Sequence, residues 1–241
     1  MSFYRCNITD SADIKSVGDK IRTEVGEPTV LVNNAGVAYE GTVLEEDEVK
    51  IRRTIEVNTL AHFLTVREFL PAMINKNHGH VVTIASMASF LALGEMVDYC
   101  CSKASALAFH EGLGQELKYW YNAPRVRTSY VSQLYFFPAV CLSDVIDILT
   151  RTKRVIHPLW VRTNMITMLT DTGGDFNQPI LTPETVSRAV CKQILSQSSG
   201  QVILPSRLTS YSLVRAFPIW AQETARGIGS SILHNLRRTV G

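Results

Sequence analysis

The chain has few cysteines, and their spacing excludes most of the roles that cysteine plays in small proteins. Five cysteines occur in 241 residues, and none falls in a Cys-x-x-Cys or Cys/His ligand spacing. An odd number that includes the adjacent pair Cys100-Cys101 does not make a disulfide framework. We therefore expect reduced thiols, a cytoplasmic setting and no structural metal site.

The sequence also lacks long apolar runs and basic clusters. No stretch reaches the roughly 18 uninterrupted apolar residues that predict a membrane-spanning helix, and residues 1–6 contain no apolar segment of a secretion signal. The formal net charge is only +2, and no basic run is interleaved with aromatic residues, which argues against a nucleic-acid partner. With 46% hydrophobic residues, the chain is long enough to bury the core of one domain.

What is present is an alternation of helix-like and strand-like segments. Helical spacing runs through residues 10–25, with Asp10 or Ser11 as the N-cap, and through residues 45–76 and 97–121. Thr182-Pro183-Glu184 begins another helix. Short apolar runs at residues 28–34, 80–86, 126–129 and 200–205 predict strands, of which 28–34 and 80–86 are expected to be buried on both faces. This order predicts βαβ units around a parallel sheet.

Tyr99 and Lys103 are four residues apart within a predicted helix, so their side chains share one face. A fixed cation stabilises a phenolate and lowers its pKa toward neutral pH, where acid–base catalysis is most efficient. A solvent-exposed pair is the ordinary alternative. Ser86, at the end of a predicted strand, and Asn58, in a predicted helix, favour the catalytic interpretation, although alone they would indicate a strand-end cap and a helix-kink hydrogen bond.

Taken together, these motifs resemble the short-chain dehydrogenase/reductase family. The matching segments, in chain order, are Asn33-Asn34-Ala35-Gly36, Asn58 in Glu56-Val57-Asn58-Thr59, Ser86 in Ile84-Ala85-Ser86, and Tyr99-x-x-x-Lys103. The resemblance implies a doubly wound, Rossmann-like α/β fold. It also implies that Tyr99 exchanges a proton with the substrate oxygen and that Lys103 lowers the pKa of Tyr99 and binds the nicotinamide ribose. Ser86 would polarise the substrate oxygen, and Asn58 would hold a water that links Lys103 to solvent.

The same resemblance implies a nicotinamide cofactor, NADP or NAD. Besides Tyr99 and Lys103, the resemblance implies that Asn7 contacts the adenine and that Asn34, Ala35 and Gly36 line the adenosine and ribose side. It also implies that Pro158, Val161 and Thr163 belong to the turn that closes over the nicotinamide. Asn7 stands where the family often has Asp, and Leu159 replaces a usual Gly. Gly36 also fits an ordinary strand-to-loop turn, and Pro158 an ordinary loop.

Two departures from the family pattern affect the expected domain. The sequence begins at what resembles the third strand, so the first two βα units with the Gly-rich phosphate-binding turn are not seen, and Gly227-Ile228-Gly229 follows no predicted strand. We expect residues 1–205 to form an incomplete dehydrogenase domain and residues 206–241 an amphipathic, basic extension. Residues 130–154 interrupt the strand that begins at Val126, and either a retained intron or a genuine insertion with an extra helix explains them.

The expected function is NAD(P)-dependent interconversion of an alcohol and a ketone or aldehyde. The closest resemblance is to the retinol and 17β-hydroxysteroid dehydrogenase branch, which implies a lipophilic substrate and a location in the cytoplasm or on the cytosolic face of the endoplasmic reticulum or a lipid droplet. Residues 206–226 either lie on a membrane surface or pack on the domain. A homodimer through the helices around 49–75 and 98–120 is implied. The alternative is a catalytically inactive chain that serves as a dimerisation or binding partner.

Overall fold

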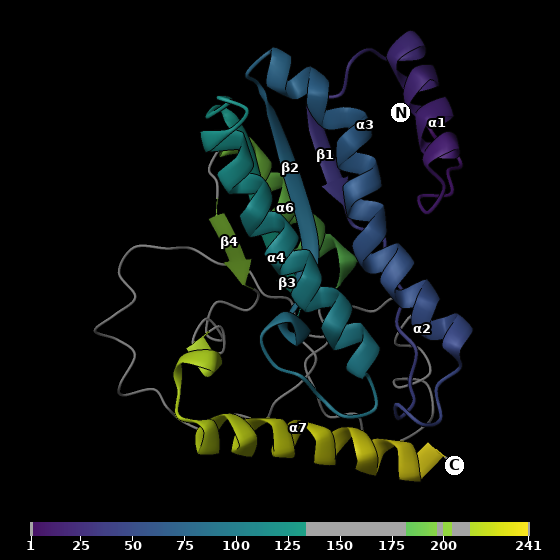
Figure 1. The fold of residues 1–241 in the computed structure, drawn as a ribbon, viewed down its shortest axis with the longest axis vertical. Helices are drawn as coiled ribbons and strands as arrows, with labels where there is room; N and C mark the ends of the chain where they lie inside the picture. The colour runs from purple at the N-terminus through teal and green to yellow at the C-terminus, as the bar shows by residue number, and fades with distance from the viewer. Residues whose placement is uncertain (1, 134–181, 197–199, 204–212, 241) are drawn as a thin grey trace.

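A computed structural model describes residues 2–133, 182–196, 200–203 and 213–240 (Figure 1). Its strands are β1 (Val30–Asn33), β2 (Gly79–Ser86), β3 (Val126–Gln133) and β4 (Gly200–Ile203). Its α-helices are α1 (Ser11–Glu24), α2 (Glu48–Ile55), α3 (Ala61–Asn75), α4 (Val97–Tyr119), α6 (Pro183–Leu195) and α7 (Ile219–Val240). A π-helical segment, Glu56–Leu60, joins α2 to α3, and a 3-10 turn, Met87–Ser89, follows β2.

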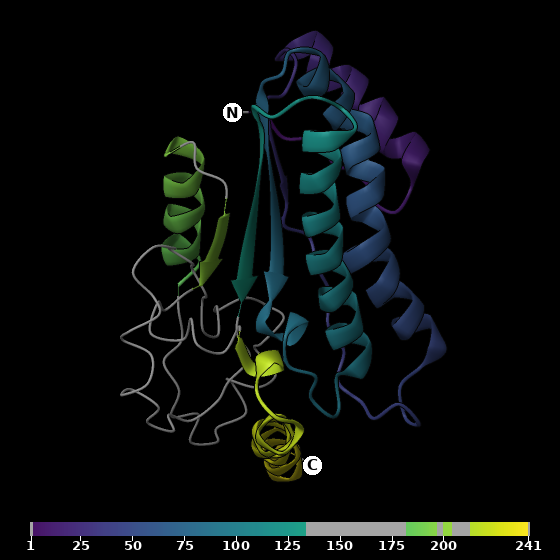
Figure 2. The same ribbon diagram turned by 60° about the vertical axis from the view of Figure 1, so that its left-hand side comes forward.

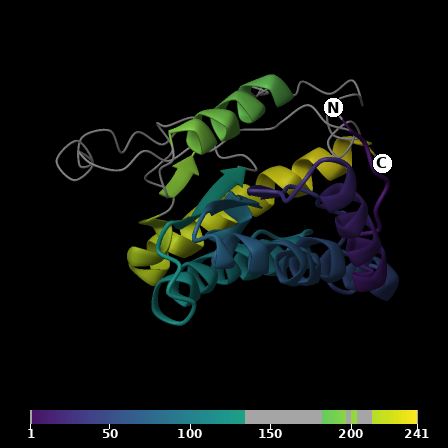
Figure 3. The same ribbon diagram turned by 90° about the horizontal axis from the view of Figure 1, so that it is seen from above.

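The described strands form one parallel sheet in the order β1-β2-β3-β4, with helices on both faces. Helices α3 and α4 cover one face, and α6 lies on the other (Figure 3). Helix α7 lies across the carboxyl ends of the strands (Figures 1 and 2). This arrangement confirms the predicted α/β class with a Rossmann-like sheet.

The predicted helix starts are confirmed in detail. Asp10 precedes α1, and its carboxylate accepts a hydrogen bond from the Ala12 N–H at 2.8 Å. Thr182 precedes α6, with Pro183 at the first helical position. Both caps supply an acceptor for N–H groups that have no partner within the helix, which is why the sequence pattern located these ends well.

The main core lies between the sheet and the pair α3 and α4. It consists of the buried side chains Val66, Leu70, Met73, Val81, Leu113, Leu117, Ala123 and Val126. A Cβ at Gly79 would lie 2.7 Å from Met73, so glycine allows the start of β2 to approach α3 closely. On the opposite face, Val190 and Ile194 of α6 pack against Val82 and Ile84.

The prediction that the first strand is buried on both faces is wrong. Strand β1 pairs only with β2 in the described sheet, and Val30 and Val32 are 38% and 40% exposed. Val30 and Val32 point to the same face of the sheet, so their exposure depends on what packs on that face at the end of the sheet, which the apolar pattern of the strand does not encode.

Strand β3 does not stop where the insertion was expected to begin. It pairs with β2 along its whole length, from Gly79↔Val126 to Ser86↔Gln133. Backbone hydrogen bonds continue past Ser129 because strand pairing does not require particular side chains. Residues 134–154, which would hold most of the expected insertion, lie outside the described part of the chain.

The C-terminal helix contacts the loop between Ser86 and Tyr99. The Gly94 N–H donates to Ser230 Oγ at 3.0 Å, and His234 Nδ1 lies 3.6 Å from Glu95 Oε1. Val214, just before α7, is buried in the apolar cluster that contains Tyr99. The extension therefore packs on the domain in its described part, as one of the two expected alternatives.

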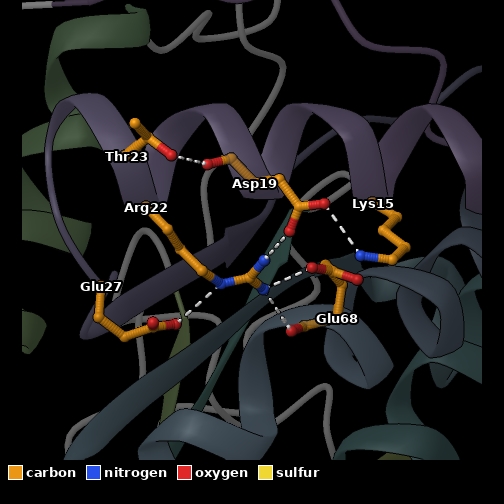
Figure 4. A network of polar contacts seen from close by, with 6 residues as sticks. All are labelled: Lys15, Asp19, Arg22, Thr23, Glu27 and Glu68. Carbon is orange, nitrogen blue, oxygen red and sulfur yellow. Dashed lines mark hydrogen bonds and ion pairs between the residues drawn. The ribbon is translucent and has the colours of Figure 1, made fainter.

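Helix α1 is attached to α3 by a network of charged groups (Figure 4). The Arg22 guanidinium donates to both the carboxylate and the backbone carbonyl of Glu68, and it also pairs with Asp19 and Glu27. The hydrogen bond with Glu68 is the main reason that the pKa of Arg22 is raised. Because Glu68 is largely buried, this pair is less screened by water than an ordinary surface ion pair.

Glu68→Gln is expected to lower the free energy of unfolding by about 1 kcal/mol, because the amide keeps the shape but removes the charge that faces Arg22. Urea denaturation measures the change. The matched control is Glu48→Gln, which removes the exposed ion pair with Arg52 and should change the stability by less than about 0.5 kcal/mol. Equal losses in the two variants would contradict an anchoring role for Glu68.

Candidate active site

The candidate site lies at the carboxyl edge of the sheet. Asn33 is the last residue of β1, and Ser86 is the last residue of β2. Ser86 is fully buried, and its Oγ accepts a hydrogen bond from the Ala88 N–H at 3.2 Å, which caps the 3-10 turn. Sites in open α/β sheets form at this edge, so the strand-end cap and a functional role for Ser86 are compatible.

Tyr99 and Lys103 lie together in the first two turns of α4. The Lys103 ammonium is 5.6 Å from the centroid of the Tyr99 ring. Both side chains are buried, with exposed fractions of 3% and 4%. A solvent-exposed pair is therefore excluded, and the apolar cluster of Ala88, Leu91, Leu93, Met96, Cys100 and Val214 surrounds Tyr99.

The burial of Lys103 changes its electrostatics. Burial lowers the pKa of the Lys103 ammonium to about 8, because the charged form loses its hydration. The ammonium donates to the backbone carbonyl of Ile84 at 3.2 Å, which ties it to β2 two residues before Ser86. An ammonium has three N–H donors, so this position leaves capacity for hydroxyl groups of a ligand.

Asn58 lies in the π-helical turn between α2 and α3, and its side chain connects this turn to the loop after β1 and to α4. Its Oδ1 accepts from the Val37 N–H at 2.8 Å, and its Nδ2 donates to the Val37 carbonyl at 2.8 Å and to Ser102 Oγ at 3.0 Å. The side chain is fully buried. The local π turn is typical of functional sites, because it re-aims one side chain without ending the helix. The expected water held by Asn58 stays a prediction.

Ser102 is a site residue that the sequence patterns did not identify. Its Oγ donates to the Tyr99 carbonyl at 2.7 Å while it accepts from Asn58, so it links the π turn to the backbone of Tyr99. A serine three residues after Tyr99 on a helix can bond back to that carbonyl. That spacing was the available signal, but it does not show what else the hydroxyl contacts.

The loop after β1 approaches Lys103 through Gly36. A Cβ at Gly36 would lie 3.3 Å from Asn58 Oδ1 and 3.5 Å from the Lys103 ammonium. The structure therefore brings Gly36, Asn58 and Lys103 together, although they are far apart in the sequence. Asn34 and Ala35, in the same loop, are exposed at this edge.

The other residues expected to bind the cofactor are not shown near Lys103. Asn7 is exposed, and its Oδ1 accepts from the N–H and the hydroxyl of Thr9, while its own N–H donates to Asp13 at 2.5 Å. Asn7 thus helps to order the start of α1. Pro158, Val161 and Thr163 lie outside the described residues.

These residues fit one half of a nicotinamide dinucleotide. Lys103 offers ammonium donors, and Gly36 leaves the space that a close backbone approach needs. A Gly-rich strand–turn–helix that would hold the pyrophosphate does not occur in the described part of the chain, where Gly227-Ile228-Gly229 lies inside α7. Among the described residues, the groups that fit the cofactor are therefore the ammonium of Lys103 and the open position at Gly36.

Lys103→Met is expected to raise the free energy of unfolding at pH 7 by up to about 3 kcal/mol. The pKa of Lys103 falls from 10.5 to about 8 on folding, so the folded chain bears an unfavourable buried charge below pH 8. The wild type should gain stability as the pH rises from 8 to 10.5, and the variant should not. Urea denaturation at pH 7 and pH 10 measures this; Lys118→Met, which changes an exposed lysine of α4, is the control. A destabilised Lys103→Met protein at pH 7 would contradict the account.

The chain is similar to several known proteins. A family model described as short chain dehydrogenase matches residues 1–132, and this match ends close to residue 130, where an insertion was expected. The chain is 53% identical over 127 residues to Dehydrogenase RED3 of Cochliobolus heterostrophus, covering 53% of this chain and 65% of that protein. It is 48% identical over 105 residues to estradiol 17-beta-dehydrogenase 11 of Macaca fascicularis, covering 44% of this chain and 35% of that protein.

Solved structures of short-chain oxidoreductases are also similar to this chain. A metagenomic short-chain oxidoreductase in complex with NADP is 30% identical, with a TM-score of 0.50, over 54% of this chain and 57% of that chain. A short-chain dehydrogenase from Streptomyces avermitilis shares the fold at 20% identity, with a TM-score of 0.64 over 93% of this chain and 80% of that one. The chain spans between a third and two thirds of the length of the curated relatives. Because the family model matches more than half of the chain, the chain belongs to the short-chain dehydrogenase family.

Proposed function

We propose that the protein is an NAD(P)-dependent oxidoreductase that interconverts an alcohol and a ketone or aldehyde. The observation that carries this proposal is the buried pair of Tyr99 and Lys103 beside the end of β2, where Ser86 lies. A phenol next to an ammonium is suited to moving one proton to or from a substrate oxygen.

In this mechanism each side chain has a separate task. The Tyr99 phenol donates a proton to the carbonyl oxygen during reduction and accepts it from the alcohol during oxidation. The Lys103 ammonium stabilises the phenolate that forms in reduction, and it does so strongly because both side chains are buried away from bulk solvent. The Ser86 hydroxyl donates a hydrogen bond to the substrate oxygen and stabilises the charge that develops there.

The cofactor would lie against the loop after β1. Lys103 would hold the ribose hydroxyls through its remaining N–H groups. Gly36, which has no side chain, would allow the ribose to approach the loop after β1 closely. When bound, the nicotinamide supplies or accepts the hydride, which no side chain of the protein can do. Asn58 and Ser102 would keep the loop and Tyr99 in register through the hydrogen bonds described above.

Tyr99→Phe is expected to reduce turnover by at least a thousandfold while the dissociation constant for NADPH changes less than threefold, because only the transferable proton is removed. Single-turnover absorbance at 340 nm with a panel of lipophilic alcohols and ketones measures the rate. Tyr119→Phe, which alters an exposed tyrosine of the same helix, should retain full activity. Turnover that survives in Tyr99→Phe would exclude the assigned role.

The proposed substrate is lipophilic. Two curated relatives are named estradiol 17-beta-dehydrogenase 11 and retinol dehydrogenase 10, which describe apolar alcohols. Leu213 and Phe217, just before α7, and Ile219 and Trp220, in its first turn, are exposed. Arg215 in this segment donates to the Phe90 carbonyl, which lies in the loop between Ser86 and Tyr99. In the described helices no apolar stretch is long enough to cross a membrane. The exposed apolar side chains of Leu213, Phe217, Ile219 and Trp220 fit contact with the surface of an endoplasmic reticulum membrane or a lipid droplet.

The wild-type protein is expected to sediment with phosphatidylcholine vesicles that contain phosphatidylserine, and the double variant Phe217→Ser/Trp220→Ser should lose at least tenfold of this partitioning. The control is Trp120→Ser, since Trp120 is equally exposed but lies at the far end of α4. The same loss in the control, or no binding by the wild type, would remove the lipid-surface proposal.

A homodimer is the proposed assembly. Leu60, the last residue of the π-helical segment, and Phe63, in the first turn of α3, are about half exposed. Phe63 packs edge-to-face on Phe109 of α4, with 4.7 Å between the ring centroids. Such an apolar surface across two neighbouring helices suits a second copy of the same chain. The same surface would also serve the alternative proposal, in which the chain is a catalytically inactive binding partner. The exposed side chains of Val30 and Val32 in β1 favour that alternative.

Phe63→Glu is expected to convert the dimer into a monomer, because a charge would be buried at the centre of the contact. Size-exclusion chromatography with light scattering gives the mass directly. Phe3→Glu, at a fully exposed position, should leave the dimer intact. A wild-type mass of one chain at micromolar concentration would contradict the assembly.

A further inference from the structure

His62 is a buried histidine that the proposed mechanism does not use. It lies in the first turn of α3 with an exposed fraction of 3%, and neither ring nitrogen has a hydrogen-bond partner among the described residues. The Phe109 ring packs on one side of it at 5.7 Å between centroids. Buried polar groups are nearly always hydrogen-bonded, so two unpartnered nitrogens in one side chain require an explanation.

Two further polar groups lie under the same part of α3. Asn33 Nδ2 and Thr83 Oγ1 are buried and also have no partner in the described part of the chain. Asn33 and Thr83 are paired across β1 and β2, so their side chains project side by side. Thr65, one helical turn after His62, donates to Asn33 Oδ1 at 2.8 Å, which shows that both strand residues face α3.

Lys103 is the charged neighbour of this group. The pKa of His62 is lowered to about 4, first by burial and then by the charge of Lys103. The Lys103 ammonium donates to the carbonyl of Ile84 at 3.2 Å, and Ile84 is the residue after Thr83 in β2. The strands β1 and β2 contribute the uncharged side chains of Asn33 and Thr83. The imidazole is therefore neutral near pH 7, with one donor and one acceptor nitrogen.

We propose that His62, Asn33 and Thr83 form a buried hydration site behind Lys103, and that this site helps to keep the ammonium protonated. Waters enclosed in proteins bind to just such sets of otherwise unpartnered donors and acceptors. A water held by His62 and Thr83 presents a lone pair toward the ammonium, so part of the hydration that burial removes is replaced. His62 is thus a positioning residue that acts through Lys103. Its catalytic consequence rests on the proposed function, whereas the hydration site does not.

The test compares His62→Phe with His110→Phe. Both histidines are buried, and both have a pKa lowered to about 4, but His110 lies on α4 nearly two turns beyond Lys103. The readout is the pKa of Lys103 from NMR spectra of protein with ¹³C-labelled lysine side chains. His62→Phe should raise the acidity of Lys103 about tenfold, because an apolar ring excludes the water. His110→Phe should leave it unchanged.

Two milder variants keep the test decisive if His62→Phe does not fold. Thr83→Val removes the hydroxyl without a change of shape and should shift the Lys103 acidity in the same direction. His62→Gln retains a donor and an acceptor and should restore most of the wild-type value. Water-to-protein NOE cross-peaks to the His62 ring should be present in the wild type and absent from Thr83→Val.

An unchanged Lys103 acidity in His62→Phe and Thr83→Val, or an equal shift in His110→Phe, would overturn the proposal. These spectra need neither cofactor nor substrate. A chain that shows the expected shifts but no turnover would therefore keep the hydration site and lose only the proposed function. If turnover is present, the pH profile of kcat should move by the same amount as the Lys103 acidity, with little effect on KM.

Discussion

The buried ammonium of Lys103 is the constraint around which the site is organised. An isolated buried cation is costly, so the surrounding elements must supply a carbonyl, a close loop and a neighbouring phenol in fixed positions. The Ile84 carbonyl fixes the ammonium against β2, Gly36 brings the loop after β1 beside it, and Tyr99 lies one helical turn away. Each of these groups comes from a different element, and the parallel sheet is what aligns their ends.

This constraint explains why stability and function are in tension here. Burial lowers the pKa of Lys103 to about 8, so the folded protein carries a charge at neutral pH that the unfolded chain holds more easily. The neighbouring His62 is neutral at the same pH, which avoids a second cation in the same region. Strained or unfavourable groups persist at active sites because selection acts on the reaction as well as on the fold.

The sequence predicted the elements well and the connections between them less well. Caps such as Asp10 and Thr182 act within a few residues, so local pattern located them. Tyr99 and Lys103 share one helix, and their spacing alone indicated contact. The exposure of β1 and the link from Asn58 through Ser102 depend on segments that are distant in the sequence. No periodicity in the sequence encodes such contacts. The prediction that these residues form one site rested on the resemblance to the family.

The central claim is that this edge of the sheet binds the nicotinamide and ribose end of a dinucleotide through Lys103. The direct measurement is a fluorescence titration of NADPH and of NADH with the wild-type protein and with Lys103→Met, whose fold should be at least as stable. The account predicts saturable binding to the wild type and a dissociation constant at least tenfold higher in the variant. No binding to the wild type, or equal binding to both proteins, would contradict it.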